Sequence, residues 1–253
     1  GMIRIVFVAS GSKGNATLIT DGESLIQIDM GVPRKTLAKG TKILGKSVED
    51  IEALFITHDH ADHIGTVSLM PKTTAVYATQ CSLNSDEVFE TIEPYCGIDV
   101  GRLCVFPFSA HHDAPNPVNY LIRVGDEKLG YVTDTGYLDD DALKILQNCD
   151  YYLFESNHDL EMLYKSRRPQ CLKDRIHSDH GHLSNVDSAI YFSEVIGPRT
   201  KAVYLGHISE ECNTADIAVS SYRRLLESRN IDPDSIQIVP TKQWDMVLGG
   251  DWE

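Results

Sequence analysis

The sequence has 253 residues, which is enough for one large domain or two small ones. Hydrophobic residues make up 42% of the chain, enough for a sizeable core, and no apolar run approaches the roughly 20 residues of a membrane span, so we expect no contact with a membrane. The formal net charge of −14 argues against a protein that coats nucleic acid without specificity.

The first predicted elements are short strands. An apolar run over residues 3–8 predicts a strand that ends in a loop of small residues, and runs at 17–20 and 25–28 predict a hairpin. Asp29 and Gly31 follow directly. An Asp at the end of a strand can orient a histidine that binds a metal, or it can cap a helix or turn, and the spacing alone leaves both readings open.

The next loop concentrates residue types that bind metals. An apolar strand over residues 53–56 precedes it, so the loop follows a strand end, where α/β proteins place their chemistry. Two of its histidines, His58 and His60, are two residues apart and point to the same side of an extended chain. Asp62 and His63 follow as the chain turns and can face a second position nearby. Imidazoles with carboxylates suit zinc, manganese or iron.

This HxHxDH pattern, behind an apolar strand and before Gly65, resembles the signature of the metallo-β-lactamase superfamily. The resemblance implies an α/β fold, a four-layer αββα sandwich, with one or two metal ions at one edge of its sheets. It also favours Asp29 as a residue that orients a metal-binding histidine.

The remaining pattern predicts alternating helices and strands without a repeat or a linker, so we expect a single domain of this fold over residues 1–253. Helices are predicted at 33–45, 84–92, 138–146, 186–196 and 215–226. Strands are predicted at 74–79, 103–108, 118–123, 128–132, 151–154, 201–205, 236–240 and 246–248.

Three of the later strands end at residues that match further superfamily ligands. The strand at 103–108 leads to His111 and His112, and branches with a His-Asp-Ala pattern use the histidine directly before Asp, which favours His112. Asp134, in Thr-Asp-Thr-Gly, matches the Asp that bridges two metals. His207 matches the histidine that completes the second metal site.

Two other residues, Glu155 and His182, lie outside the motifs that match metal ligands. Glu155 follows a predicted buried strand, and His182 precedes Ser184, a plausible helix N-cap. His182 can therefore be an ordinary loop residue, and Glu155 can be a partner of the basic segment that lies between them. That segment and the basic stretch at 34–46, which contains the predicted helix and Lys46 just after it, hold ten of the 23 Lys and Arg residues. Its proposed substrate-binding residues are Arg167, Arg168, Lys173 and Arg175.

Taken in order, several motifs are similar to the YycJ/VicX (WalJ) branch, bacterial metallo-hydrolases regarded as DNA exonucleases. They are Ser10-Gly11-Ser12 with Gly14-Asn15, His112-Asp113-Ala114, Thr133-Asp134-Thr135-Gly136, Glu155-Ser156-Asn157-His158-Asp159 and Gly181-His182-Leu183-Ser184-Asn185. The branch tends to carry glycine where this chain has Asn119, and serine is common where it has His111.

The resemblance implies hydrolysis of phosphodiesters by a hydroxide that bridges two divalent metals, zinc or manganese, with iron as a third option. One metal would be held by His58, His60 and His112. The other would be held by Asp62, His63 and His207, and Asp134 would bind both. Glu155 and His182 match the pair that delivers a proton to the leaving alkoxide in RNase Z enzymes.

DNA is the favoured substrate, and other functions stay open. They are hydrolysis of RNA or a cyclic nucleotide, hydrolysis of a thioester or lactam, and metal binding in a regulatory module without catalysis. The six cysteines form no CxxC pair and no regular framework, and a chain of this length folds without disulfides. We therefore expect reduced thiols and a cytoplasmic protein.

Overall fold

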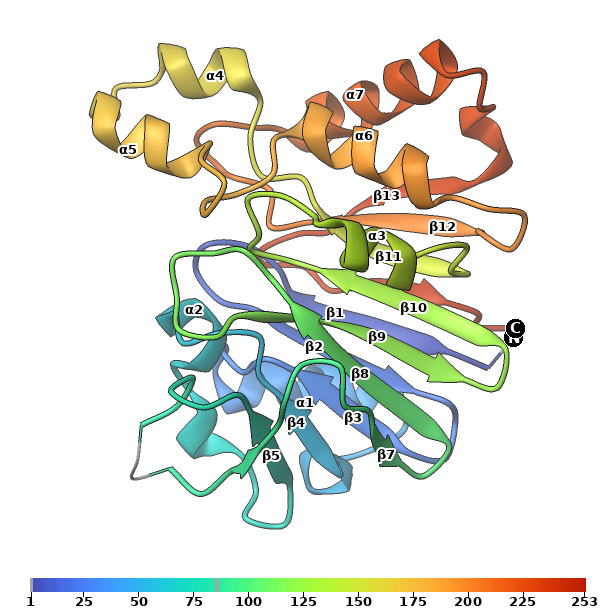
Figure 1. The fold of residues 1–253 in the computed structure, drawn as a ribbon. Helices are drawn as coiled ribbons and strands as arrows, with labels where there is room; N and C mark the ends of the chain where they lie inside the picture. Colours follow the sequence, from blue (N-terminus) through green and yellow to red (C-terminus); the bar gives the residue numbers. More distant parts are fainter. Residues whose placement is uncertain (1, 85–86) are drawn as a thin grey trace. The chain divides into compact units, whose positions relative to one another are not determined.

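Figure 1 shows the computed structural model, which describes residues 2–84 and 87–253. These residues fall into two compact units. Of these residues, 2–84, 87–109, 114–127 and 242–253 form unit 1, and 110–113 and 128–241 form unit 2. A single domain over residues 1–253 stays a prediction. Among the described residues, no helix is both long and apolar enough to cross a membrane.

Unit 1 is built on a mixed sheet. In spatial order its strands are β14 (Val247–Gly250), β1 (Arg4–Ala9), β2 (Ala16–Thr20), β3 (Leu25–Ile28), β4 (Ala53–Phe55), β5 (Ala75–Ala78) and β6 (Glu90–Thr91). The first four strands pair antiparallel, and β3 to β6 pair parallel. The predicted hairpin of β2 and β3 is confirmed, with Thr17 opposite Ile28.

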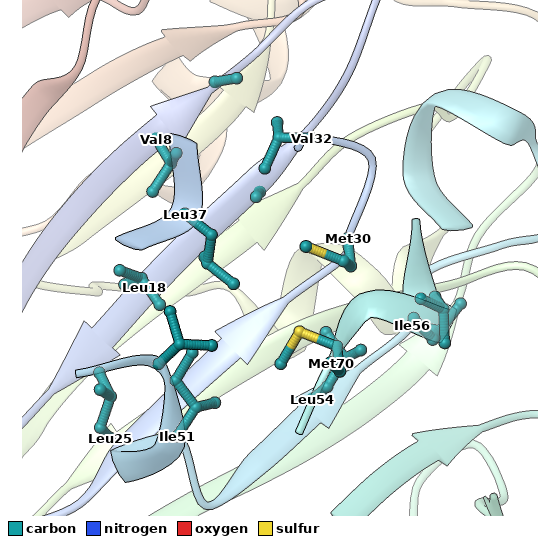
Figure 2. Close-up of a cluster of buried hydrophobic side chains, with 14 of the residues drawn as sticks. Val8, Leu18, Leu25, Met30, Val32, Leu37, Ile51, Leu54, Ile56 and Met70 are labelled. Atoms are coloured by element: carbon teal, nitrogen blue, oxygen red, sulfur yellow. The ribbon is translucent and has the colours of Figure 1, made fainter. Parts of the chain in front are cut away.

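One helix covers this sheet. Helix α1 (Arg34–Ile43) buries Leu37, Gly40 and Thr41, which lie on one face at helical spacing. Figure 2 shows Leu37 among Val8 and other buried side chains of the sheet. A Cβ atom at Gly40 would lie 2.7 Å from Val8, so only glycine lets the helix approach this closely. The short elements η1 (Val48–Asp50), α2 (Ala61–Ile64) and η2 (Val67–Leu69) complete this part of the unit.

Unit 1 also contains an antiparallel group of three strands. They are β7 (Ile98–Val100), β8 (Leu103–Ser109) and β9 (Val118–Val124). From β9, the Tyr120 hydroxyl donates a hydrogen bond to the carbonyl oxygen of Ile56, directly before the histidine loop. The backbone N–H of Val118 donates to the carbonyl oxygen of Thr57, 2.9 Å away, so this group of strands fixes the start of that loop.

The helix predicted over residues 84–92 is wrong in the part that the structure describes. Residues 85–86 lie outside the described residues, and Glu90–Thr91 form strand β6, which pairs with β5. The N–H of Ile92 extends this pairing by donating to the carbonyl oxygen of Ala78. Val88 and Ile92 would share one face of a helix, but in the structure Val88 is 94% exposed and Ile92 is buried, as expected for residues that do not lie on a common helix face. The segment also contains branched and aromatic residues, which favour strands.

Unit 2 is built on a parallel sheet. Its strands, in spatial order, are β13 (Gln237–Pro240), β12 (Ala202–Gly206), β11 (Tyr151–Glu155) and β10 (Glu127–Val132). Helices α6 (Asn185–Val195) and α7 (Ala215–Ser228) lie side by side and pack on β11 and β13 respectively (Figure 1). The Ser184 hydroxyl accepts a hydrogen bond from the N–H of Asp187, which confirms Ser184 as the N-cap of α6.

The remaining helices of unit 2 are short. They are α3 (Asp140–Ile145), α4 (Leu160–Lys165), α5 (Gln170–Ile176) and the single turn η3 (Pro233–Ser235). The sequence predicted α3 but not α4 and α5, which occupy the basic segment.

Candidate metal centre and proton-transfer pair

The histidine loop of unit 1 follows β4 and brings three imidazole rings together. The ring centroids of His58 and His60 are 4.7 Å apart, and those of His58 and His63 are 4.1 Å apart. The chain turns into α2 directly after His60, which brings His63 back beside His58. The rings of His58 and His63 are buried. The loop therefore groups donors that suit a transition metal.

Asp29 fixes the orientation of this loop from the end of β3. One carboxylate oxygen, Oδ1, accepts the backbone N–H of Thr57 at 2.8 Å. The other, Oδ2, accepts the Thr57 hydroxyl at 2.7 Å and lies 2.6 Å from Nδ1 of His63. A fully buried carboxylate accepts the proton of that Nδ1, so Nε2 of His63 carries the lone pair that can bind a metal.

Thr57 orients a second histidine in the same way. Its hydroxyl donates to Asp29 and lies 2.9 Å from Nδ1 of His58, so it accepts the proton of that nitrogen. Nε2 of His58 is then the nitrogen with the lone pair. Sequence reasoning did not assign a role to Thr57, although it lies within the motif, because a threonine before a histidine carries no signal of its own.

Asn15 is a further residue that sequence reasoning did not place in the site. Its side-chain amide donates to the Asp62 carboxylate at 3.1 Å and lies 3.3 Å from Nε2 of His63. Its backbone N–H donates to the Asp62 carbonyl oxygen at 2.8 Å. Gly31 packs against the same carbonyl, since a Cβ atom there would lie 1.9 Å from it. Asn15 and Gly31 thus fix the position of Asp62.

In unit 2, the parallel sheet gathers polar residues at one edge. Asp134 follows β10, Glu155 ends β11 and His207 follows β12, so all three lie at the carboxyl ends of adjacent parallel strands. Together with His182, from the loop before α6, they offer ligand-type atoms that all lie within 4.8 Å of one another. Nδ1 of His182 is 3.2 Å, and Nε2 of His207 is 3.5 Å, from Oδ1 of Asp134.

The strand ends carry unusual backbone conformations. Asp134 has φ of 44° and His207 has φ of 51°, and in unit 1 Asp29 has φ of 61°. Residues other than glycine rarely adopt this left-handed region, and such residues concentrate at functional sites. In each of the three, the backbone turns sharply at the end of a strand.

Glu155 and His182 form a close pair. Oε1 of Glu155 lies 2.5 Å from Nδ1 of His182, and Oε2 accepts the N–H of Thr135 at 3.2 Å. Burial alone would lower the pKa of His182, but the carboxylates of Glu155 and Asp134 outweigh it and raise that pKa to about 10. Burial raises the pKa of Glu155 above its ordinary value. At neutral pH the pair therefore holds a proton, which lies on the imidazole.

The two neighbouring histidines His111 and His112 have different surroundings. His112 is buried, its Nδ1 donates to the carbonyl oxygen of Gly181 at 2.8 Å, and its ring lies 5.2 Å from that of His182. His111 stacks on Tyr137 at 4.0 Å, and its Nε2 lies 2.8 Å from Asp139. The hydrogen bond to Gly181 leaves Nε2 as the nitrogen of His112 with a lone pair that could bind a metal.

Three of the four basic residues predicted to bind substrate have partners within unit 2. Arg168 pairs with Glu211 at 2.9 Å, and Arg175 pairs with Asp113. Lys173 is buried and donates to the carbonyl oxygen of Tyr164 at 2.9 Å. Arg167 is exposed between α4 and α5. The basic segment thus combines structural contacts with exposed charge.

A further histidine of the Glu155 motif is also deeply buried. Nε2 of His158 lies 3.1 Å from Nδ1 of His177, and its Nδ1 lies 3.1 Å from the side-chain oxygen of Asn157. Burial, followed by the charges of neighbouring histidines, lowers the pKa of His158 to about 3. The side-chain amide of Asn157 donates to the His207 carbonyl oxygen at 3.0 Å, so this motif supports the His207 loop.

The donor sets of both units fit a divalent metal. Each unit presents imidazoles together with a carboxylate. In unit 1 these groups belong to His58, His60, Asp62 and His63. In unit 2 they belong to His112, Asp134 and His207. The Nδ1 atoms of three of these histidines face an oxygen of Asp29, Thr57 or Gly181, as metal-binding histidines do in proteins. This combination of nitrogen and oxygen donors suits zinc, manganese or iron.

Comparisons with known proteins agree with this chemistry. The beta-lactamase superfamily domain model matches residues 28–208. The chain is 33% identical to exodeoxyribonuclease YycJ of Bacillus anthracis over 233 residues, 88% of each protein, and 33% identical to exodeoxyribonuclease WalJ of Streptococcus pneumoniae over 228 residues, 83% of each.

A solved structure supports the same fold. The metallo-β-lactamase fold protein YhfI of Bacillus subtilis matches with a TM-score of 0.71 at 14% identity, over 98% of this chain and 99% of that one. The chain thus has the αββα sandwich expected from its sequence. It belongs to the metallo-β-lactamase superfamily, in the branch of the YycJ and WalJ proteins, and is a metal-dependent hydrolase.

Proposed function

We propose that this protein is a dinuclear metal-dependent phosphodiesterase that degrades DNA from an end. The curated relatives YycJ and WalJ, which match over most of the chain, are both named exodeoxyribonucleases. The observation that carries the proposal is the pair of Glu155 and His182 beside Asp134. A protonated imidazole next to the reacting group can donate the proton that the leaving alkoxide of a phosphodiester takes up.

The ligand assignment follows the order of superfamily ligands along the chain. In this assignment His58, His60 and His112 would hold one metal. Asp62, His63 and His207 would hold the other, and Asp134 would contribute to both. Asp29 and Thr57 keep the unit 1 histidines in the tautomer that binds a metal. When bound, two divalent cations supply the Lewis acidity that activates a water and neutralises charge on the phosphate.

Residues of the chain then orient the attacking water and donate a proton to the leaving group. The carboxylate of Asp62, clamped by Asn15, orients the attacking water. Glu155 keeps the His182 imidazole protonated and fixed, because it accepts the proton of Nδ1. The other nitrogen, Nε2, then donates its proton to the leaving 3′ or 5′ oxygen. Such general acid catalysis contributes on the order of 10²–10⁴-fold to a rate.

The proposal is tested by comparing substrate classes on one preparation. The protein is treated with a chelator, reconstituted with zinc or manganese, and assayed with a single-stranded DNA oligonucleotide, an RNA oligonucleotide, a cyclic nucleotide, a chromogenic β-lactam and a thioester. We expect hydrolysis of DNA that depends on added metal. Hydrolysis of the lactam or thioester without cleavage of any phosphodiester would overturn the proposal, and metal binding without hydrolysis of any substrate would indicate a regulatory module.

A further inference from the structure

Trp244 is a large aromatic side chain on the surface of unit 1. It lies in the segment between β13 and β14, and 71% of its surface is exposed. The Lys13 ammonium group lies over the indole, 5.7 Å from the ring centroid. Most of the indole is thus in contact with solvent and a cation lies over its ring, a combination of groups that can bind the base and the phosphate of a nucleotide.

The segment that carries Trp244 is fastened to the loop of residues 10–15. The side-chain oxygen of Gln243 accepts the backbone N–H of Lys13, and its side-chain nitrogen donates to the carbonyl oxygen of Gly14, both at 2.9 Å. The N–H of Ser10 donates to the carbonyl oxygen of Lys242 at 3.1 Å. These bonds hold Lys13 and Trp244 in a defined mutual position.

The same loop leads directly to the histidine loop of unit 1. Asn15, two residues after Lys13, contacts both Asp62 and His63. Two residues span at most about 7 Å of backbone. The backbone of Lys13 therefore lies within about 7 Å of that of Asn15, which contacts two residues to which a metal is assigned.

We propose that Trp244 and Lys13 form a binding platform for single-stranded DNA, on which Trp244 stacks against a nucleobase and Lys13 binds the adjacent phosphate. The inference rests on the proposed function and specifies how its substrate is held. Aromatic rings beside cationic groups are the usual means of binding single strands without sequence preference. Lys242 adds positive charge to this segment in a chain whose formal net charge is −14.

The chain has two tryptophans, Trp244 and Trp252, so fluorescence can report on the platform directly. In Trp252→Phe, the remaining emission comes from Trp244 alone, and stacking by a base quenches it. A phosphorothioate single-stranded oligonucleotide, which resists hydrolysis, should give saturable quenching in this variant. In Trp244→Phe the emission of Trp252, whose indole N–H donates to the carbonyl oxygen of Gly249 at 2.7 Å, should stay constant.

Binding affinity gives the second measurement, by anisotropy of the labelled oligonucleotide. Trp244→Ala should raise its Kd about tenfold, which corresponds to the loss of one stacked base, and Trp244→Phe should recover part of the affinity. Lys13→Ala should lower the dependence of Kd on salt. Leu248→Ala, which removes another exposed apolar side chain of unit 1, is the matched control and should leave Kd unchanged.

The outcomes separate this inference from the proposed function. If the wild-type protein hydrolyses DNA but the Kd of Trp244→Ala equals that of the wild type and Trp252→Phe shows no quenching, the platform is wrong and the activity stands. If no DNA is hydrolysed with either metal, the proposed function fails. If Trp244→Ala dissociates an oligomer and leaves Kd unchanged, the indole contacts a second copy of the chain and the platform is likewise overturned.

Discussion

The Glu155 carboxylate and the His182 imidazole are joined by a 2.5 Å contact between Oε1 and Nδ1, although 27 residues separate them in the chain. Glu155 is fixed at the end of β11, and its other oxygen accepts backbone N–H groups of Thr135 and Leu183. The imidazole also lies 3.2 Å from Asp134. The pair thus has two candidate roles, as proton donor or as part of a metal site.

His182→Ala distinguishes these roles. If His182 supplies the proton, the variant should lose about 10²–10⁴-fold in kcat on DNA and keep its full metal content. The loss should be much smaller on bis(p-nitrophenyl) phosphate, because p-nitrophenolate leaves without a proton. Glu155→Gln should show a milder form of the same pattern. Measurements are kcat on both substrates and elemental analysis of each variant.

Two results would contradict the role in proton transfer. Loss of a metal equivalent from His182→Ala would make it a ligand, as the group of Asp134, Glu155, His182 and His207 permits. An equal loss of kcat on both substrates, together with a lower melting temperature, would mean that Gly181–Asn185 serves only to begin α6 and has no part in proton transfer.

Asp29→Asn tests how strongly the buried carboxylate supports the histidine loop. Asn tolerates the positive φ of this position, so the backbone can be kept, whereas Ala would add strain. The amide cannot serve as acceptor to Thr57 and His63 as the carboxylate does. We expect metal affinity to fall about 10–100-fold. Competition with a chromogenic chelator measures it, and an unchanged affinity would leave Asp29 with the role of a turn residue.

Elemental analysis of ligand variants tests the metal assignment. The wild-type protein should bind up to two metal ions per chain. Asp134→Asn, which keeps a residue that tolerates positive φ, should weaken both sites because Asp134 is assigned to both. His207→Ala should empty mainly one of them. An Asp134→Asn protein with its full metal content would exclude the bridging role.

The adjacent histidines provide a matched pair for the same analysis. His112→Ala should lose metal, because its Nδ1 bond to Gly181 directs Nε2 as a ligand. His111→Ala should keep metal, since its ring is bound to Asp139 and Tyr137. The reverse result would exchange the two assignments.

The basic segment is tested by neutralising its charges. Arg167→Ala alone should weaken DNA binding and lower the salt slope by about one, because its exposed guanidinium can reach a phosphate. Replacing Arg167, Arg168, Lys173 and Arg175 together should flatten the salt dependence further. Hydrolysis of bis(p-nitrophenyl) phosphate should persist in both. Equal loss on DNA and on this small substrate would mean that the segment is structural, as the buried Lys173 suggests.

Local patterns predicted most of the strands, because a strand depends largely on neighbouring residues. The run before His58 is fully buried and forms β4, and the spacing of two residues between His58 and His60 brings their rings together. The same reasoning predicted α6 from Ser184, whose side chain caps it.

Other features depend on partners that are distant in the chain. A helix was predicted over residues 84–92, but part of this segment forms strand β6, because it pairs with β5 and the N–H of Ile92 donates to Ala78. Helices α4 and α5 have only six and seven residues, too short to be stable alone, so their formation depends on packing within unit 2. Asn15 contacts Asp62, which lies 47 residues later in the sequence, and no local sequence pattern predicts such a contact.

The central claim, a metal-dependent exonuclease, is tested most directly with two single-stranded DNA substrates that differ only in having ends. Linear and covalently closed circular DNA of the same sequence are incubated with the protein, reconstituted with manganese or zinc, and with Asp134→Asn. We predict that the metal-loaded wild-type protein degrades the linear DNA progressively to short products and leaves the circle intact, and that Asp134→Asn degrades neither. Intact linear DNA with both metals, or cleavage of the circle at the same rate as the linear strand, would contradict the account.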